Sequence, residues 1–389
     1  MQASRIRQIS PFRVVQLLER AKALEAAGHR VVHFEVGEPD FPTAPPIVEA
    51  GRAALTAGAT RYTESLGLPA LRARIAEWYR ETAGVAIAPQ RVVVTAGASG
   101  ALLLLSALLL DPGDELLLPE PGYPCNDPFA RLVGAVPVAV PVLAEDGFRV
   151  DPGQVAAAWT AASRGLLVAS QANPTGAVLE PERLTALVHT VRERGGALLL
   201  DEIYQGLIYE DIGYRSGLAL DDGIYVLNSF SKYFGMTGWR LGWMVLPESQ
   251  VEPVARLAQN LFISPSSVAQ HAALAAFEPA AVAIHEERRA AFARRLVRLC
   301  DGLESLGFRI PARPAGAFYV YVDVSRTGID AMTFCERLLE RHHVAVTPGL
   351  DFGRRDAERF VRFAFTTGEA DIDLGLERIA DALADWGAR

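Results

Sequence analysis

The chain has 389 residues, half of them hydrophobic and 22% charged, so it is long enough for two domains and has the composition of a globular enzyme. Its net charge of -8 argues against nucleic acid or an anionic membrane as a partner. Three scattered cysteines indicate neither a disulfide framework nor a zinc site, and the first residues lack the apolar core of a secretory signal, so we expect a reduced, cytoplasmic protein.

The beginning of the chain alternates helical patterns with stiff turns. Ser10 before Pro11 predicts the start of a helix that ends before Gly28, and a strand is predicted at Val31–Val36. The turn Gly37–Pro42 follows, with two prolines. Further helices are predicted at 46–57, 69–82 and 98–110, and the last of these is too short to span a bilayer.

Short apolar strands then alternate with helices. Such continuous apolar strands are typical of a mostly parallel sheet covered by helices on both faces, which places the chain in the α/β class. Seven strands are predicted, at residues 91–94, 115–118, 136–142, 165–170, 197–200, 224–228 and 241–246.

The pattern changes around His285, where a charged helix begins that ends at Gly307. Shorter elements follow: strands at 316–324, 344–347 and 360–365, and helices at 331–341 and 371–386. We therefore expect a large domain over residues 46–284, a smaller α+β domain over 285–389, and an N-terminal segment, 1–45, that joins the small domain.

Polar and glycine-rich segments follow five of the strands. Ligands of such sheets bind beyond the carboxyl ends of the strands, so these segments are expected to lie together. The turn at Gly97, which opens a helix, offers backbone amides to a phosphate, although it is neither a dinucleotide fingerprint nor a P-loop. The other segments contain Tyr123, Asn173, Asp201 with Tyr204, and Ser229 with Lys232.

Three charged residues suggest chemistry at this edge. Of 38 basic residues only Lys22 and Lys232 are lysines, and a lysine amine can act as nucleophile and base, although Lys232 could also be an ordinary surface residue. Asp201 ends a buried strand and would need a cationic partner, unless it caps the next helix. Arg362 lies among apolar strand residues and would need an anion, unless the strand is an exposed edge or Arg359 takes this role.

Several motifs occur together in one order. They are Gly-Glu-Pro-Asp at 37–40, Asn-Pro-Thr-Gly at 173–176, Asp-x-x-Tyr at 201–204, Ser-x-Ser-Lys at 229–232 and Gly-x-x-Gly-x-Arg-x-Gly at 235–242. The pattern resembles the class I and II aminotransferases, which are fold type I pyridoxal-phosphate enzymes, and it covers nearly the whole chain. The family often has a second Asn-Pro pair where this chain has Ser-Gln-Ala at 170–172.

The resemblance implies that pyridoxal 5'-phosphate is the cofactor. Lys232 would form a Schiff base with it and then move the substrate's Cα proton, while Asp201 would keep the pyridine nitrogen protonated. Tyr204 and Asn173 would hydrogen-bond the ring's phenolic oxygen, and Tyr123 would stack on the ring.

The resemblance also implies phosphate, substrate and partner contacts. The phosphate would lie against the backbone amides of Ala98 and Ser99 with Ser229 and Arg240, and Tyr62 would reach the phosphate of the neighbouring subunit in a homodimer. The substrate's α-carboxylate would be bound by Arg362, Asn173 and the backbone of Gly37, with the small domain closing over it.

These implications predict an aminotransferase that moves an amino group from an L-amino acid to a 2-oxo acid such as 2-oxoglutarate. A carbon–sulfur β-lyase or a decarboxylase on the same scaffold is an alternative, and a non-catalytic pyridoxal-phosphate-binding regulator is a more remote one. The apolar residues Ala101–Leu105, Phe34 and Phe41 favour a neutral or aromatic substrate.

Overall fold

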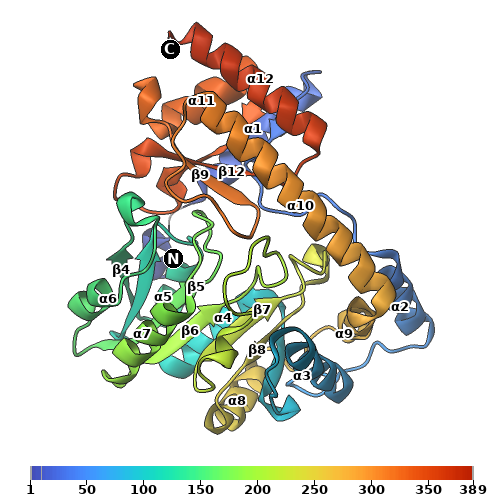
Figure 1. Ribbon diagram of the computed structural model, residues 1–389. Helices are drawn as coiled ribbons and strands as arrows, with labels where there is room; N and C mark the ends of the chain where they lie inside the picture. The colour runs from blue at the N-terminus through green and yellow to red at the C-terminus, as the bar shows by residue number, and fades with distance from the viewer. Residues whose placement is uncertain (1, 10, 388–389) are drawn as a thin grey trace.

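The computed structural model describes residues 2–9 and 11–387, and its largest sheet has seven strands (Figure 1). Their order is β2-β8-β7-β6-β5-β3-β4, and β8 runs antiparallel to both neighbours while the others are parallel to one another. This confirms the predicted mostly parallel sheet. The strands are β2 (Val92–Thr95), β3 (Glu115–Glu120), β4 (Val136–Pro141), β5 (Ser163–Ala169), β6 (Ala197–Asp201), β7 (Tyr225–Ser229) and β8 (Gly242–Val245).

Apolar residues on both faces of each strand explain why this sheet is covered on both sides. In β6, Leu198 and Leu200 pack into one buried cluster with α7, while Leu199 packs into a second cluster with α4 and α8. Successive strand residues point to opposite faces, so an uninterrupted apolar strand needs a helix layer on each. The helices of this part are α2 (Pro45–Thr56), α3 (Pro69–Ala83), α4 (Gly97–Leu109), α5 (Asn126–Leu132), α6 (Pro152–Ala158), α7 (Pro181–Arg192), α8 (Val251–Leu261) and α9 (Ser267–Leu274).

Two smaller sheets form the upper part of the molecule in Figure 1. One is antiparallel, in the order β11-β12-β9, and the other pairs β1 with β10 in parallel. The elements are α1 (Arg13–Ala26), β1 (Val32–His33), β9 (Tyr319–Asp323), α11 (Ala331–His342), β10 (Val344–Ala345), β11 (Thr347–Pro348), β12 (Phe360–Ala364) and α12 (Glu369–Asp385).

The N-terminal segment differs in two details from the prediction. The strand expected at 31–36 is only two residues long, because the Glu35 carbonyl accepts hydrogen bonds from the side chains of Arg362 and Thr347 instead of a neighbouring strand. Helix α1 begins at Arg13 rather than Pro11, and Ser10, the predicted cap, lies outside the described residues. Pairing of β1 with β10 joins this segment to the C-terminal part of the chain.

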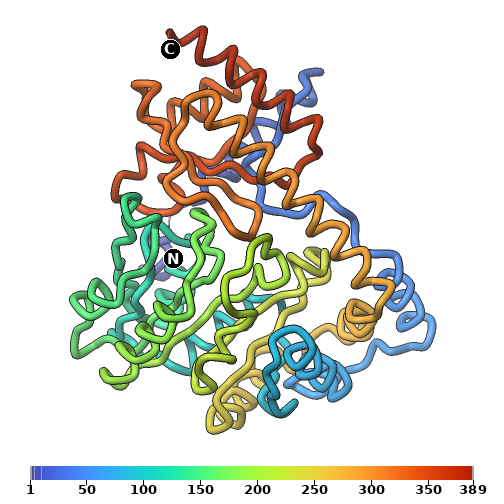
Figure 2. The backbone as a smooth tube through the Cα atoms, viewed as in Figure 1, coloured from blue at the N-terminus to red at the C-terminus, as the bar shows by residue number. Residues whose placement is uncertain are grey.

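Helix α10 (Pro279–Ser305) connects the two parts of the molecule. It continues without a break through residue 285, and Figures 1 and 2 show it running from the region of α9 up to the C-terminal elements. Buried Arg295 on this helix makes two hydrogen bonds to Asp40, at 2.7 and 2.9 Å, in the turn that follows β1. Among the described residues, no helix has the length and apolar composition needed to cross a bilayer.

Candidate active site

A single cavity of about 590 Å³ lies beyond the carboxyl ends of the parallel strands. Every site residue predicted from the sequence lines this cavity except Tyr62. Tyr62 lies elsewhere on the chain and is 80% exposed. The predicted residues that share the cavity are Gly37, Ala98, Ser99, Tyr123, Asn173, Asp201, Tyr204, Ser229, Lys232, Arg240 and Arg362. The strand-end prediction is therefore correct about which segments meet.

Lys232 enters the cavity from the turn after β7. Its Nζ donates a hydrogen bond to the carbonyl oxygen of Gly37 at 2.8 Å and lies 5.5 Å from the centre of the Phe318 ring. Burial lowers the pKa of this amine to about 8, an effect that the nearby Glu38 carboxylate partly opposes. With such a pKa about one amine in ten is neutral at pH 7, far more than for an ordinary lysine, and only the neutral form acts as nucleophile or base.

Asp201, the last residue of β6, has a carboxylate at the floor of the cavity. Within the described residues its only side-chain hydrogen bond comes from the amide of Ile203, at 2.9 Å, and no helix starts there, so Asp201 is not a helix cap. Burial raises its pKa to about 7, with Lys232 partly opposing the shift. A protonated ring nitrogen would provide the cationic partner that this carboxylate lacks.

A cup suited to an anion lies where α4 begins. Gly97 has φ +68°, and a Cβ atom there would lie 2.7 Å from a guanidinium nitrogen of Arg240. The first amides of α4 have no partner within the helix and point, with the helix dipole, toward this cup. Ser229 donates to Ser231 at 3.0 Å, and Arg240 approaches Ser231 at 3.5 Å. Ser231 was not predicted as a site residue, although the Ser-x-Ser-Lys motif contains it.

Arg362 is a buried cation without a carboxylate partner among the described residues. Its Nη1 donates to Oδ1 of Asn173 at 3.0 Å, and its Nη2 donates to the carbonyl of Glu35. The guanidinium lies between two aromatic rings, 4.4 Å from the centre of Tyr319 and 4.8 Å from that of Phe352, and its Nε makes no hydrogen bond. Planar guanidinium donors match a carboxylate well, so this group can bind an acid from the cavity.

The competing arginine, Arg359, has a different position. Its Nη2 donates to Asp323 at 2.8 Å, and its side chain is 43% exposed. Arg362, in contrast, lies in the central strand of the antiparallel sheet and is 5% exposed. Strand β12 therefore directs Arg362, and not Arg359, into the cavity.

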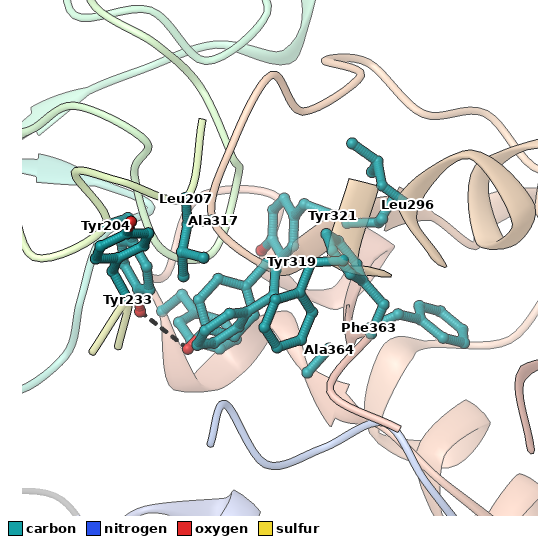
Figure 3. Close-up of a cluster of buried hydrophobic side chains, with 14 of the residues drawn as sticks. Tyr204, Leu207, Tyr233, Leu296, Ala317, Tyr319, Tyr321, Phe363 and Ala364 are labelled. Carbon is teal, nitrogen blue, oxygen red and sulfur yellow. Dashed lines mark hydrogen bonds between the residues drawn. The ribbon is translucent and has the colours of Figure 1, made fainter. Parts of the chain in front are cut away.

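Tyr319 is a cavity residue that sequence reasoning missed. Its hydroxyl accepts a hydrogen bond from the hydroxyl of Tyr204 at 3.0 Å (Figure 3), and its ring packs on Arg362. A Cβ atom at Gly37 would lie 1.9 Å from the Tyr319 hydroxyl, which explains why glycine occupies position 37. Burial raises the pKa of both tyrosines, so both hydroxyls keep their protons at neutral pH. Tyr319 thus connects three predicted site residues, although it lies 115 positions from Tyr204 in the sequence.

The sequence and the fold of this chain are similar to those of known proteins. Residues 29–379 match the family model described as aminotransferase class I and II. The chain belongs to the class I and II aminotransferases. This aminotransferase is 37% identical over 381 residues to the aspartate/prephenate aminotransferase of Thermus thermophilus, with 97% of this chain and 98% of the relative covered.

Two further similarities agree with this membership. The aminotransferase is 36% identical over 376 residues to the valine–pyruvate aminotransferase of Mycobacterium tuberculosis, covering 96% of this chain and 97% of that one. A crystal structure of an aminotransferase from the same organism superimposes with a TM-score of 0.95 at 35% identity, covering 99% of both chains. The protein is therefore a fold type I, pyridoxal-phosphate-dependent amino-acid aminotransferase.

The lowered pKa of Lys232 predicts a pH dependence for cofactor attachment to the cofactor-free aminotransferase. Only the neutral amine attacks an aldehyde, so the rate should rise with pH and be half-maximal near pH 8, where Asp201, with its pKa near 7, is already ionised. The rate of absorbance change on mixing with pyridoxal phosphate measures this. A midpoint near 10.5, the ordinary lysine value, would show that burial does not control the amine.

Tyr319→Phe tests the contact between the two tyrosines. Loss of one hydrogen bond of about 1 kcal/mol should lower kcat about fivefold and shift the pH dependence of the bound cofactor's absorption, because Tyr204 loses its orienting partner. The matched control is Tyr214→Phe, which removes a buried hydroxyl that donates to Ser170 at 2.9 Å outside the cavity. If both variants changed the absorption equally, Tyr319 would have only a structural role.

Proposed function

We propose that this aminotransferase moves an amino group from an L-amino acid to a 2-oxo acid such as 2-oxoglutarate, with Lys232 as the residue that carries the chemistry. The observation that supports this most is one cavity containing three complementary groups: an amine of lowered pKa, a carboxylate without a cation, and a guanidinium without an anion. An amino acid and a protonated pyridine ring supply the missing partners.

The residues present fit pyridoxal phosphate, on which the family depends. The anion cup, formed by the amides of Ala98 and Ser99 with Ser229 and Arg240, would hold the phosphate, while Asp201 would face the pyridine nitrogen. When bound, this cofactor supplies an aldehyde for amine exchange and a ring that accepts electrons. Tyr123 lines the same cavity and would pack on the ring.

The chain's own residues then bind the substrate and move its proton. Arg362 would bind the α-carboxylate through its guanidinium, assisted by Asn173 and the backbone at Gly37. This contact would hold the substrate's Cα within reach of Lys232, whose neutral amine would take the Cα proton and deliver it to the cofactor carbon that carried the aldehyde. Tyr204 would hydrogen-bond the ring's phenolic oxygen, with Tyr319 holding its hydroxyl in place.

We further propose a cytoplasmic homodimer in which Tyr62 completes the phosphate site of the neighbouring subunit. Tyr62 is 80% exposed and lies outside its own chain's cavity, as a residue that serves another subunit would. The amide of its neighbour Thr63 donates a hydrogen bond to Ser264 at 3.4 Å, so the segment before α9 lies beside Tyr62 and would face the partner with it. We also propose that residues 46–284 and 285–389 act as large and small domains, with residues 1–45 joined to the small one.

Replacement of the two lysines tests the assigned chemistry. Lys232→Ala should abolish both turnover and covalent attachment of the cofactor, while Lys22→Ala, which removes the exposed lysine of α1, should retain both. Borohydride reduction followed by peptide mass spectrometry should locate the cofactor on Lys232 in the wild type and in the control variant.

The same preparations separate transamination from the alternatives. An L-amino acid should remove the absorption band of the covalently bound cofactor, and a 2-oxo acid should restore it. Release of ammonia and pyruvate instead would indicate a β-lyase, and turnover near the wild-type level in Lys232→Ala would refute the proposed role.

A pair of arginine variants tests carboxylate binding. Arg362→Lys loses the planar pair of donors, so kcat/KM for the amino acid should fall by about 30-fold or more, equivalent to about 2 kcal/mol. Arg359→Lys, three residues away on the exposed side, should remain within about twofold of the wild type. Steady-state kinetics at saturating cofactor measure both, and equal effects would contradict the assignment of Arg362.

A further inference from the structure

The part of the cavity beside Arg362 is apolar, but its residues differ from those that the sequence suggested. Phe34 packs on Phe363 and Phe41 packs on Phe292, and neither lines the cavity. Of the run 101–105, only Leu102 does. Four other apolar residues of the cavity lining, here termed the apolar wall, are Val14, Val15, Phe148 and Phe352, and of these Phe352 lies directly against Arg362.

Contacts with neighbouring groups hold the apolar wall against Arg362. Phe352 stacks on its guanidinium at 4.8 Å. The carboxylate of Asp351 accepts hydrogen bonds from the amides of Arg13 and Val14, at 3.0 and 2.8 Å, so the start of α1 is fixed next to Phe352. These contacts place Phe352, and next to it the start of α1 with Val14, beside the guanidinium that would bind the α-carboxylate.

The ring of Tyr321 connects the aromatic members of the apolar wall. Its centre lies 6.1 Å from that of Phe352 and 5.5 Å from that of Phe148. Val15 is 47% exposed although it lines the cavity, so the chain leaves apolar surface uncovered at this point. Covering that surface with an apolar group is favourable because it removes apolar area from water.

The charged groups around the apolar wall are already neutralised within the chain. Arg149 lines the cavity but pairs with Glu180 at 2.8 Å. Asp351 is occupied by the α1 amides and by Arg13, whose guanidinium lies 3.6 Å away. Lys232, Arg240 and Asp201 also line the cavity but are assigned above to the cofactor, and the carboxylate of Glu38 would repel an acidic side chain. Among the described residues that line the cavity, no cation is therefore left for a second carboxylate beyond those assigned to the cofactor and to the α-carboxylate, and burial of an unpaired carboxylate is costly.

We propose that the amino donor has a neutral, apolar side chain, aliphatic or aromatic, which packs on the apolar wall while Arg362 binds the α-carboxylate. This inference rests on the proposed function, because it uses Arg362 as the carboxylate site. It names Val14, Val15, Phe148 and Phe352 as specificity-determining residues.

A series of donors tests the inference on the holoenzyme. Rates of the amino-donor half-reaction are measured without an oxo acid, for alanine, 2-aminobutyrate, norvaline, leucine, phenylalanine, aspartate and glutamate. Each methylene placed in an apolar pocket contributes roughly tenfold, so the rate constant per donor concentration should rise at least tenfold from alanine to leucine. Aspartate and glutamate should react at least tenfold more slowly than leucine.

The outcomes test the preference for an apolar donor separately from the proposed aminotransferase function. Faster reaction with aspartate or glutamate than with leucine would overturn the inference and leave the aminotransferase assignment intact. No reaction with any amino acid would refute the proposed function itself. Equal rates along the alanine-to-leucine series would show that the side chain does not contact an apolar surface.

Two half-exposed valines supply a matched pair of variants. Val15→Arg adds a cation to the apolar wall and should lower the leucine rate at least tenfold while moving the leucine-to-aspartate ratio toward aspartate. Val297→Arg adds the same group to a valine of α10 that is 51% exposed and lies outside the cavity, and should leave the ratio unchanged. If Val15→Arg does not fold, Val15→Ala should still reduce the preference for leucine over alanine, and an unchanged preference would contradict the inference.

Discussion

The structure depends on burying the Arg362 guanidinium without an acidic partner. A buried cation is costly unless its donors are satisfied, and here a side-chain amide, a backbone carbonyl and two aromatic rings satisfy it only in part. These partners come from separate parts of the chain: Asn173 follows β5, Glu35 follows β1, and Tyr319 begins β9. The carboxylate site therefore exists only when the large sheet, the N-terminal segment and the antiparallel sheet are assembled.

The other charged groups of the cavity follow the same principle of incomplete pairing. Burial shifts the pKa of Lys232 downward and that of Asp201 upward, and each shift moves the group toward its neutral form. The charge of Asp201 opposes the lowering of the Lys232 pKa only weakly, and the charge of Lys232 opposes the raising of the Asp201 pKa only weakly. The aminotransferase thus keeps an amine and a carboxylate close together without a tight ion pair between them. A tight ion pair would leave neither group available to a ligand.

Most of the fold, and most of the residues that meet at the cavity, could be predicted from patterns of neighbouring residues, because the polar residues of the site directly follow apolar strands. Uninterrupted apolar strands predict a sheet covered on both faces, and the residues after those strands must meet at one edge. The choice of Arg362 over Arg359 followed from its apolar neighbours, which the burial of β12 explains. Motifs in a fixed order then supplied the family and the roles.

What could not be predicted depends on contacts between distant segments. No local pattern connects Tyr319 with Tyr204 or with Gly37, because their proximity arises only when the start of β9, the turn after β6 and the turn after β1 meet at the cavity. The short length of β1 reflects a carbonyl that bonds to side chains of β11 and β12. Phe34 and Phe41 appeared suited to a substrate pocket only because apolar residues in the core and in a cavity look alike in a sequence.

Helix α10 also constrains how the molecule can move. Its 27 residues form a rod about 40 Å long, and no proline interrupts it after the first position to provide a kink. The paired hydrogen bonds from Arg295 attach it to Asp40, three residues beyond the glycine whose carbonyl accepts from Lys232. The ring of Phe292 on α10 also packs 5.6 Å from that of Phe318, next to β9. A tilt of α10 would therefore displace both the turn at residues 37–40, which contacts Lys232, and the sheet carrying Arg362. Closure of the small part of the molecule over the substrate and the position of the Lys232 amine would both depend on the orientation of α10.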